Sequence, residues 1–316
     1  MNAATTTKAT TAALPNRSQE QASTPLFTAP QTGHPLAIGD GFTASSFRER
    51  DYGGAMDPLV MVDHYRMTEP TFGPHPHAGL SAVSILFEDS IGRFHNRDSL
   101  GNDIDLMPGD LYWLKAGSGA IHDEKPVAGA STHGLQVFVN LPSSLKSKAP
   151  ESLHVKASDM PLLQSEGYRV RLVLGRTNGT AGRVSPALPM TILDGTLAAG
   201  STFSHDLQAG ENAWIYALKG ELELVTGSTT VRLRAGEAVA LNADAIEAIN
   251  SHTLDLTNQT HAEAHFALLA AEPVNEAFVQ KGPFVMNNHA EIARIEADYA
   301  AGMLGSLPGA QSGSLV

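Results

Sequence analysis

Short apolar runs separated by turn residues dominate this chain of 316 residues and constrain its fold more than any other feature. Between residues 35 and 142 the runs include Val60–Val62, Ala82–Phe87 and Leu135–Val139, and the gaps are rich in Gly, Pro, Asn and Asp. Runs of this length between turn signals are typical of strands, because a globular helix needs a longer periodic stretch. The pattern therefore predicts an all-β sandwich or barrel.

The same pattern of short apolar runs between turn residues recurs in the second half of the chain, between residues 191 and 271. Ala213–Leu218 and Glu221–Val225 flank the turn Lys219-Gly220 and predict a hairpin. The two halves are similar in length and in this pattern of short apolar runs. They therefore indicate two β-domains, with an internal duplication as one explanation.

The ends and the middle of the chain differ from these two blocks. Residues 1–33 are rich in Ala, Thr, Ser, Gln and Pro without hydrophobic periodicity, so we expect a disordered arm there. We expect the first barrel at 34–142, a connector at 143–189, the second barrel with a C-terminal helix at 190–302, and a frayed tail at 303–316.

The C-terminal helix is expected at about residues 289–302. Asn288 can cap its first turn, and Glu291 stands at the capping-box position. Ile292, Ile295 and Tyr299 follow at helical spacing and form one apolar stripe, which Met303 extends. The stripe predicts that the helix packs across a sheet.

Composition excludes several classes of function. The chain has 13 His and no Cys, so any metal must be held by imidazole, carboxylate, carbonyl or water. Its 21 basic and 33 acidic residues give a net charge of −12, which disfavours direct nucleic-acid binding. There is no apolar run long enough to predict a membrane span. The absence of cysteine fits a reducing compartment, and we expect the cytoplasm.

In the first block, two pairs of side chains are two residues apart, which on a strand places both members of a pair on the same face. His75 and His77 flank Pro76, and His122 precedes Glu124 by two residues. Residues two apart on a strand point to the same side, so each pair can aim into one barrel interior. Pro76 favours an edge strand, because proline donates no ladder hydrogen bond.

Three imidazoles and one carboxylate form a donor set that suits iron(II), manganese, cobalt or nickel, with zinc also possible. Such a set can leave coordination positions open for a substrate. A pair of this kind also arises by chance in a chain with 13 histidines, so ordinary histidines are the alternative. Spacing along the chain does not show that the two pairs meet.

A series of longer motifs resembles the pirin family, in the order in which that family carries them. Together they are spread over most of the range 35–302. The motifs are Asp63–Tyr65, Pro74–Gly79, Asp98–Asn102, Pro108–Asp110, Ala116–Glu124, Leu135–Pro142 and Gly282–Asn287, followed by the helix with Ile292 and Tyr299.

The resemblance implies a fold and a site. Pirins are bicupins, with two cupin barrels (double-stranded β-helices) in tandem and a C-terminal helix. The family carries one transition metal, usually iron, in the N-terminal barrel, and its ligands fall on His75, His77, His122 and Glu124. Several pirins share quercetin 2,3-dioxygenase activity, in which a flavonol reacts with O₂. Glu124 would then be both a ligand and, when off the metal, the base that accepts the flavonol proton.

The resemblance leaves other functions open. Some pirins act as transcription cofactors or bind metabolic enzymes, so a metal-containing regulatory protein with a protein partner and little catalysis is the main alternative. Another enolisable or aromatic substrate is a third possibility. We expect the pocket rim to draw on Phe72, Phe87 and Trp113, unless these residues are plain core.

The chain departs from the family at several positions. Ser81 stands where ordinary cupins and many pirins carry Glu, which excludes the standard cupin ligand set but leaves the pirin set intact. Asn96 replaces a histidine that many relatives carry, and the adjacent His95 would face the other way on a strand. Phe138 replaces the usual tryptophan of a later strand.

The second barrel lacks the histidine constellation. His205 stands alone there, and no convincing carboxylate completes a set with His261 and His265. We therefore expect a packing domain without metal. His64 is expected to lie near the first barrel in a structural role.

Overall fold

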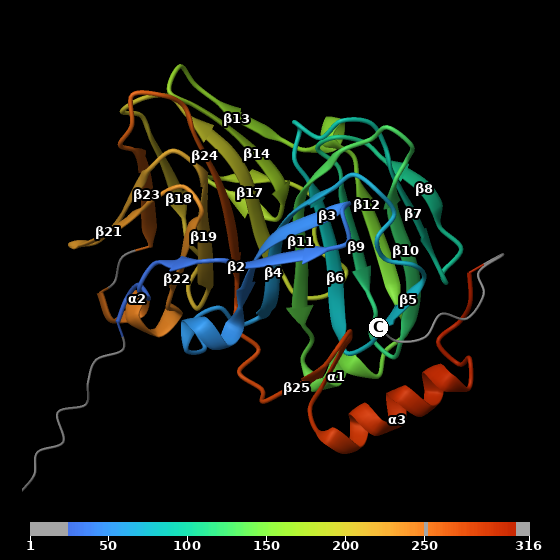
Figure 1. The fold of residues 1–316 in the computed structure, drawn as a ribbon. Helices are drawn as coiled ribbons and strands as arrows, with labels where there is room; N and C mark the ends of the chain where they lie inside the picture. The colour runs from blue at the N-terminus through green and yellow to red at the C-terminus, as the bar shows by residue number, and fades with distance from the viewer. Residues whose placement is uncertain (1–24, 250–251, 308–316) are drawn as a thin grey trace, which may run out of the picture.

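Two β-barrels lie side by side in the computed structural model, which describes residues 25–249 and 252–307 (Figure 1). Each barrel pairs one seven-stranded sheet with one four-stranded sheet. The prediction of an all-β chain is therefore confirmed. Residues 1–24 of the expected arm and 308–316 of the expected tail lie outside the described residues.

The first barrel contains the strands between residues 34 and 155. Its large sheet has the order β12 (Glu151–Val155), β9 (Leu111–Lys115), β6 (Leu80–Leu86), β11 (Thr132–Asn140), β4 (Leu59–Met67), β3 (Phe42–Arg48) and β2 (His34–Ile38). Its small sheet has the order β5 (His75–His77), β10 (Ala120–Pro126), β7 (Phe94–Asp98) and β8 (Asp103–Leu106).

The second barrel repeats this plan. Its large sheet has the order β1 (Gln31–Thr32), β22 (Glu237–Leu241), β19 (Asn212–Lys219), β24 (Ala264–Ala271), β17 (Met190–Leu197), β14 (Tyr168–Leu174) and β13 (Leu162–Gln164). Its small sheet has the order β18 (Thr202–Asp206), β23 (Thr253–Asn258), β20 (Leu222–Thr226) and β21 (Thr229–Leu233).

Short elements complete the fold. They are the two-stranded sheets β15 (Arg176–Thr177) with β16 (Thr180–Ala181) and β25 (Val279–Lys281) with β26 (Phe284–Met286), the helices α1 (Ser143–Lys146), α2 (Ala243–Ile249) and α3 (His289–Ala300), and the 3₁₀ turns Glu49–Tyr52 and Ala157–Asp159.

The two large sheets meet at the junction between the barrels. Phe47 of the first barrel contacts Trp214 and Tyr216 of the second, with ring centroids 5.3 and 5.1 Å apart. Central strands such as β6 are therefore buried on both faces, one toward their own barrel and one toward the junction. This arrangement explains why every residue of β6 is buried and only Ser81 and Ser84 interrupt its apolar side chains, whereas β20 of a small sheet alternates buried and half-buried residues.

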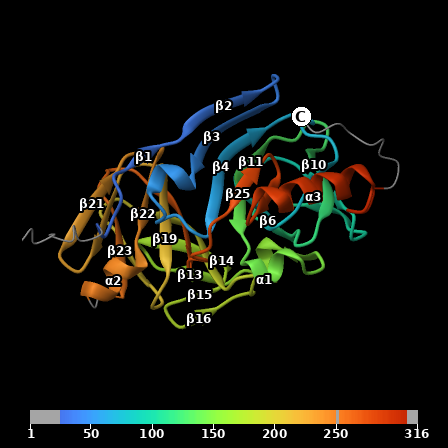
Figure 2. The same cartoon turned by 90° about the horizontal axis from the view of Figure 1, so that it is seen from below.

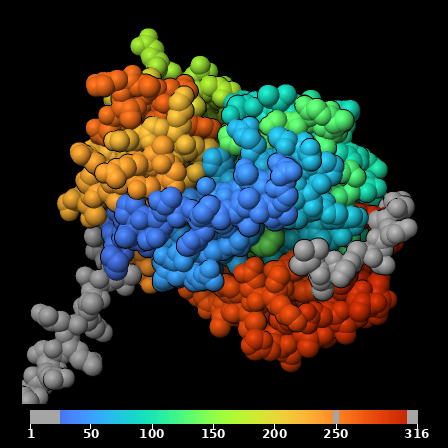
Figure 3. Space-filling model, in the orientation of Figure 1, coloured from blue at the N-terminus to red at the C-terminus, as the bar shows by residue number. Residues whose placement is uncertain are grey.

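Segments at both ends of the described chain tie the barrels together. The N-terminal segment runs across the front of both barrels in Figure 3, because β1 pairs with β22 of the second barrel while β2 and β3 join the first. Leu26 and Phe27 are buried against the second barrel. Residues 25–33 thus differ from the expected disordered arm, because they bury apolar side chains and pair with a strand.

The C-terminal helix follows the second barrel in sequence but packs against the first (Figure 2). Asn288 accepts a hydrogen bond from the Glu291 amide at 3.0 Å, which confirms the predicted cap. Ile292 and Ile295 are buried with Ala78 of the first barrel. Met303 lies beyond the helix end and is 65% exposed, so it does not extend the apolar stripe.

The expected connector at 143–189 contributes strands to both barrels. Its strand β12 belongs to the large sheet of the first barrel, whereas β13 and β14 belong to that of the second. No helix among the described residues is long and apolar enough to cross a membrane.

Candidate metal centre

Strands β5 and β10 bring the two histidine-containing pairs together. The strands are antiparallel neighbours, with His75 opposite His122 and His77 opposite Ala120. β5 is the edge strand of the small sheet, which accommodates Pro76. The pairing places both members of each i, i+2 pair on the inner face of the sheet.

Gly79 fixes the turn that follows the β5 histidines. Its φ of +72° is in the left-handed region, and a Cβ atom there would lie 1.9 Å from the carbonyl oxygen of Val285. Only glycine allows β26 to approach so closely. The C-terminal segment therefore presses directly on the segment that carries His75 and His77.

Three imidazole nitrogens converge at the centre of this arrangement. The Nε2 atom of His122 lies 3.0 Å from the Nε2 atoms of both His75 and His77. Two ligands at right angles, each about 2.1 Å from one ion, are about 3.0 Å apart. The three histidines thus fit a single ion, and they are the one such group of three found among the described residues.

The protonation of the three imidazoles also suits metal binding. The Nδ1 atom of His75 is 2.8 Å from the carbonyl oxygen of Gly73, which must accept the Nδ1 proton and leaves the Nε2 lone pair free. Burial lowers the pKa of His75, and it lowers the pKa values of His77 and His122 far more, with help from the neighbouring imidazoles. Neutral imidazoles are the form that binds metals.

Glu124 lies on the same inner face but outside the group of three. Its Oε2 atom is 4.0 Å from Nδ1 of His122, and both carboxylate oxygens lie within 2.9 Å of the Ser84 hydroxyl. Burial raises the pKa of Glu124 to about 7, although the Ser84 hydrogen bond lowers it. The carboxyl group can therefore hold or release a proton near neutral pH.

A cavity of about 90 Å³ opens beside these four residues. Its walls are largely aromatic, and Phe42 stacks on Tyr65 with ring centroids 5.9 Å apart. The remaining lining residues are Met67, Phe72, Phe94, Gln136 and Phe138. Such apolar walls would leave a bound ring little contact with water and would orient it through the few polar groups present.

The prediction of the residues at the cavity rim is only partly correct. Phe72 lines the cavity. Phe87 and Trp113 are buried in the junction between the barrels, where Phe87 contacts the rings of His133 and His265. The alternation along β9 turns Tyr112 toward the interior of the first barrel and Trp113 away from it.

Sequence reasoning missed Phe42, Ser84, Phe94 and Gln136 as parts of the site. Ser84 and Gln136 lie on β6 and β11 of the large sheet, opposite the sheet that carries the histidines. Tyr65 was seen only as part of the Asp63–Tyr65 motif. Their one signal is strand alternation relative to a known inward residue, which needs the register of the sheet.

Other histidines take part in the junction and not in the centre. His64 bonds Tyr216 at 2.7 Å and His133 at 2.7 Å, and burial lowers its pKa to about 4. His265 bonds Asp194. In the second barrel His205 bonds Thr177 at 2.8 Å.

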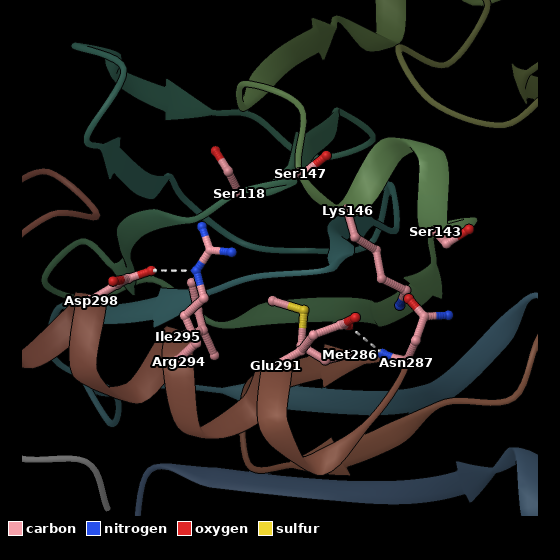
Figure 4. A pocket seen from close by; sticks show the side chains of 10 residues that line it. All are labelled: Ser118, Ser143, Lys146, Ser147, Met286, Asn287, Glu291, Arg294, Ile295 and Asp298. Atoms are coloured by element: carbon pink, nitrogen blue, oxygen red, sulfur yellow. Dashed lines mark hydrogen bonds and ion pairs between the residues drawn. The ribbon is translucent and has the colours of Figure 1, made fainter.

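A second cleft, of about 230 Å³, lies between α1 and α3 (Figure 4). Lys146 reaches from α1 and donates to the carbonyl oxygens of Gly79 and Val285 and to Asn140 Oδ1, at 3.0, 2.8 and 2.7 Å. Burial lowers the pKa of Lys146 to about 8. Because its three donors are used, Lys146 acts here as a clamp that holds β26 against the histidine-bearing turn.

Comparisons with known proteins agree with this geometry. The family model described as Pirin matches residues 25–139, and that described as Pirin C-terminal cupin domain matches residues 192–305. Pirin of Mus musculus is 32% identical over 246 residues, which is 77% of this chain and 81% of that protein. A pirin-like protein of Solanum lycopersicum is 30% identical over 251 residues, which is 79% of this chain and 82% of that protein.

One solved structure resembles nearly the whole chain. It is a crystal structure of quercetin 2,3-dioxygenase from Acinetobacter baumannii, with a TM-score of 0.76 and 27% identity, and the match covers 89% of this chain and 98% of that one. The expectation of two cupin barrels in tandem is confirmed.

Proposed function

Because the chain belongs to the pirin family, we propose that it is a mononuclear metal-dependent dioxygenase of the quercetin 2,3-dioxygenase type. The proposed substrate is a flavonol or a related enolisable aromatic compound, and O₂ is the co-substrate. One observation carries the proposal: three neutral imidazoles converge at a cavity with aromatic walls. The Acinetobacter baumannii enzyme of similar fold supports the choice of reaction.

The proposed ligands are His75, His77, His122 and Glu124. We propose iron(II) as the metal, and manganese, nickel, cobalt or zinc would fit the same nitrogen and oxygen donors. When bound, the metal supplies a Lewis acid that polarises the oxygen atoms of the substrate. The imidazoles need no deprotonation on binding, because burial already keeps them neutral.

Glu124 is proposed as the general base when its carboxylate is off the metal. A flavonol must lose its hydroxyl proton before it reacts as an enolate, and the base that takes the proton works best with a pKa near the operating pH. Burial raises the pKa of Glu124 to about 7, which suits this role. Ser84 holds the carboxylate on the cavity wall, and the aromatic walls exclude water from the ring.

A direct assay tests the proposal. Full-length protein loaded separately with iron(II), manganese, nickel, cobalt or zinc is mixed with quercetin, and O₂ uptake and carbon monoxide release are measured. We expect both signals with at least one metal and their loss in Glu124→Gln. Metal-loaded protein that consumes no O₂ with any of the five would contradict the proposal and favour the regulatory alternative.

A further inference from the structure

The hydroxyl group of Tyr65 is buried beside the metal centre without a protein partner. The residue is 2% exposed and lines the cavity together with the three histidines and Glu124. Its oxygen makes no hydrogen bond to any of residues 25–249 or 252–307. A buried hydroxyl is costly to leave unpaired, and the equally buried Tyr112 and Tyr216 both find side-chain partners. The Tyr52 hydroxyl also lacks one within these ranges, but Tyr52 lies in the core cluster that contains Trp214 and not at the cavity.

The ring of Tyr65 is held rigidly, so its hydroxyl has a fixed direction. Phe42 stacks on it at an interplanar angle of 15°, and Phe72 meets Phe42 edge-on with centroids 5.0 Å apart. Phe94 contacts the Tyr65 ring at 6.4 Å. A donor on such a rigid support loses little conformational freedom when a ligand binds.

Tyr65 is a deeply buried polar side chain that the cavity leaves without a protein partner among the described residues. Apart from the histidines and Glu124, the described lining residues include two polar side chains, Tyr65 and Gln136. The Gln136 Oε1 atom already accepts a hydrogen bond from the Ser84 hydroxyl at 3.0 Å. A ligand oxygen that points away from the histidines can therefore meet the Tyr65 hydroxyl, which is more deeply buried than the half-buried Gln136 amide.

The size of the cavity limits what can lie between its aromatic walls. Its volume is about 90 Å³, whereas pockets for drug-sized ligands span about 300–1,000 Å³. An apolar cavity of about 150 Å³ in another protein accepts one benzene. The space is smaller than that benzene cavity, so it suits part of one ring, and at least two rings of a three-ring flavonol would remain outside.

We propose that Tyr65 is a positioning residue for a compact, one-ring substrate that carries adjacent hydroxyl and carbonyl groups. The chemistry is that of a 3-hydroxy-4-pyranone: two oxygens face the histidines, the ring lies between the aromatic walls, and the Tyr65 hydroxyl donates to one of the oxygens. The inference rests on the proposed function, because it needs the metal centre to bind the oxygen pair.

Binding without turnover tests the inference. Cobalt-loaded full-length protein is titrated without O₂ with maltol (3-hydroxy-2-methyl-4-pyranone) and, separately, with quercetin, and calorimetry gives each Kd while cobalt absorption reports ligand entry. The variants are Tyr65→Phe and, as the matched control, Tyr52→Phe, which removes a buried hydroxyl in the core cluster that contains Trp214. Cobalt content is measured for every sample.

We expect maltol to bind more tightly than quercetin. Tyr65→Phe should weaken maltol binding roughly tenfold to a hundredfold, as for a hydrogen bond to a charged oxygen, with cobalt content unchanged. Tyr52→Phe should bind maltol like the wild type. An unchanged maltol Kd in Tyr65→Phe at full cobalt content, or quercetin binding more tightly than maltol, would overturn the inference alone. Wild-type protein that takes up no cobalt would overturn the proposed function as well.

Discussion

The two barrels share one architecture but place different side chains at the same inward positions. The small sheets have matching orders, so β18 corresponds to β5 and β23 to β10. The inward residues of β5 and β10 are His75, His77, His122 and Glu124. Those of β18 and β23 are Phe203, His205, Leu254 and Leu256.

The register of the paired strands sharpens this contrast. His75 stands opposite His122 on β10, whereas Phe203 and His205 stand opposite Leu256 and Leu254 on β23. The His205 imidazole lies among leucines instead of other metal-ligating side chains, so it bonds Thr177 and stays neutral. The comparison teaches that backbone pairing sets the barrel, whereas four inward side chains decide whether its interior binds a metal or is plain core.

The largest expected effect separates the barrels by metal content. His75→Ala removes one of three converging nitrogens, so metal affinity should fall by more than about a hundredfold. This loss exceeds the one caused by removing a residue that only supports a metal ligand through a hydrogen bond. His205→Ala is the matched change in the second barrel and should leave the metal content of the chain unchanged. Elemental analysis of the purified variants measures both.

Full metal occupancy in His75→Ala would remove the basis for the site. Loss of metal in His205→Ala with the fold intact by circular dichroism would show that the second barrel also contributes to metal binding, and the comparison would then fail.

The difference in metal-binding residues between the two barrels could be predicted from local spacing, because alternation along a strand is visible within three consecutive residues. His75 with His77 and His122 with Glu124 are visible in this way. The contact between the pairs joins residues 47 positions apart, and only the pairing of β5 with β10 shows it. The family resemblance implied that the four residues form one ligand set, but not which strands pair.

Other parts of the site could not be read from the sequence. Tyr65, Ser84 and Gln136 lie on β4, β6 and β11 of the large sheet, where alternation shows which side chains face the cavity only once the register with a known inward residue is available. Trp113 was assigned to the rim for the same reason, and it faces the junction. The pairing of β1 with β22 joins residues about 200 positions apart and turned part of the expected arm into a strand.

Metal removal should destabilise the first barrel and spare the second. A ligand that binds only the folded state stabilises it by about 4 kcal/mol at a free concentration of 1,000 times Kd. Chelation should therefore increase hydrogen exchange at residues 75–77 and 120–126, but not at 202–206 and 253–258. Hydrogen-exchange mass spectrometry with and without metal measures this, and equal changes in both barrels would contradict the contrast.

The smallest expected effect uses the acid sensitivity of the second barrel. Burial lowers the pKa of His205 to about 4 from an ordinary value of 6.5. Between these values the unfolded chain binds a proton that the folded chain does not, so stability falls as pH decreases, and nothing is lost above pH 6.5. For this one group the loss is about 2 kcal/mol at pH 5.

His205→Leu should remove that contribution and leave a shallower decline in unfolding free energy between pH 6.5 and 4. Urea unfolding at several pH values measures the slope for the variant and the wild type. The comparison of slopes is needed because His64, with its pKa also lowered to about 4, adds a decline of its own at the junction in both proteins. An unchanged slope in His205→Leu would show that His205 takes up its proton in the folded barrel, and that this interior is less apolar than its leucines indicate.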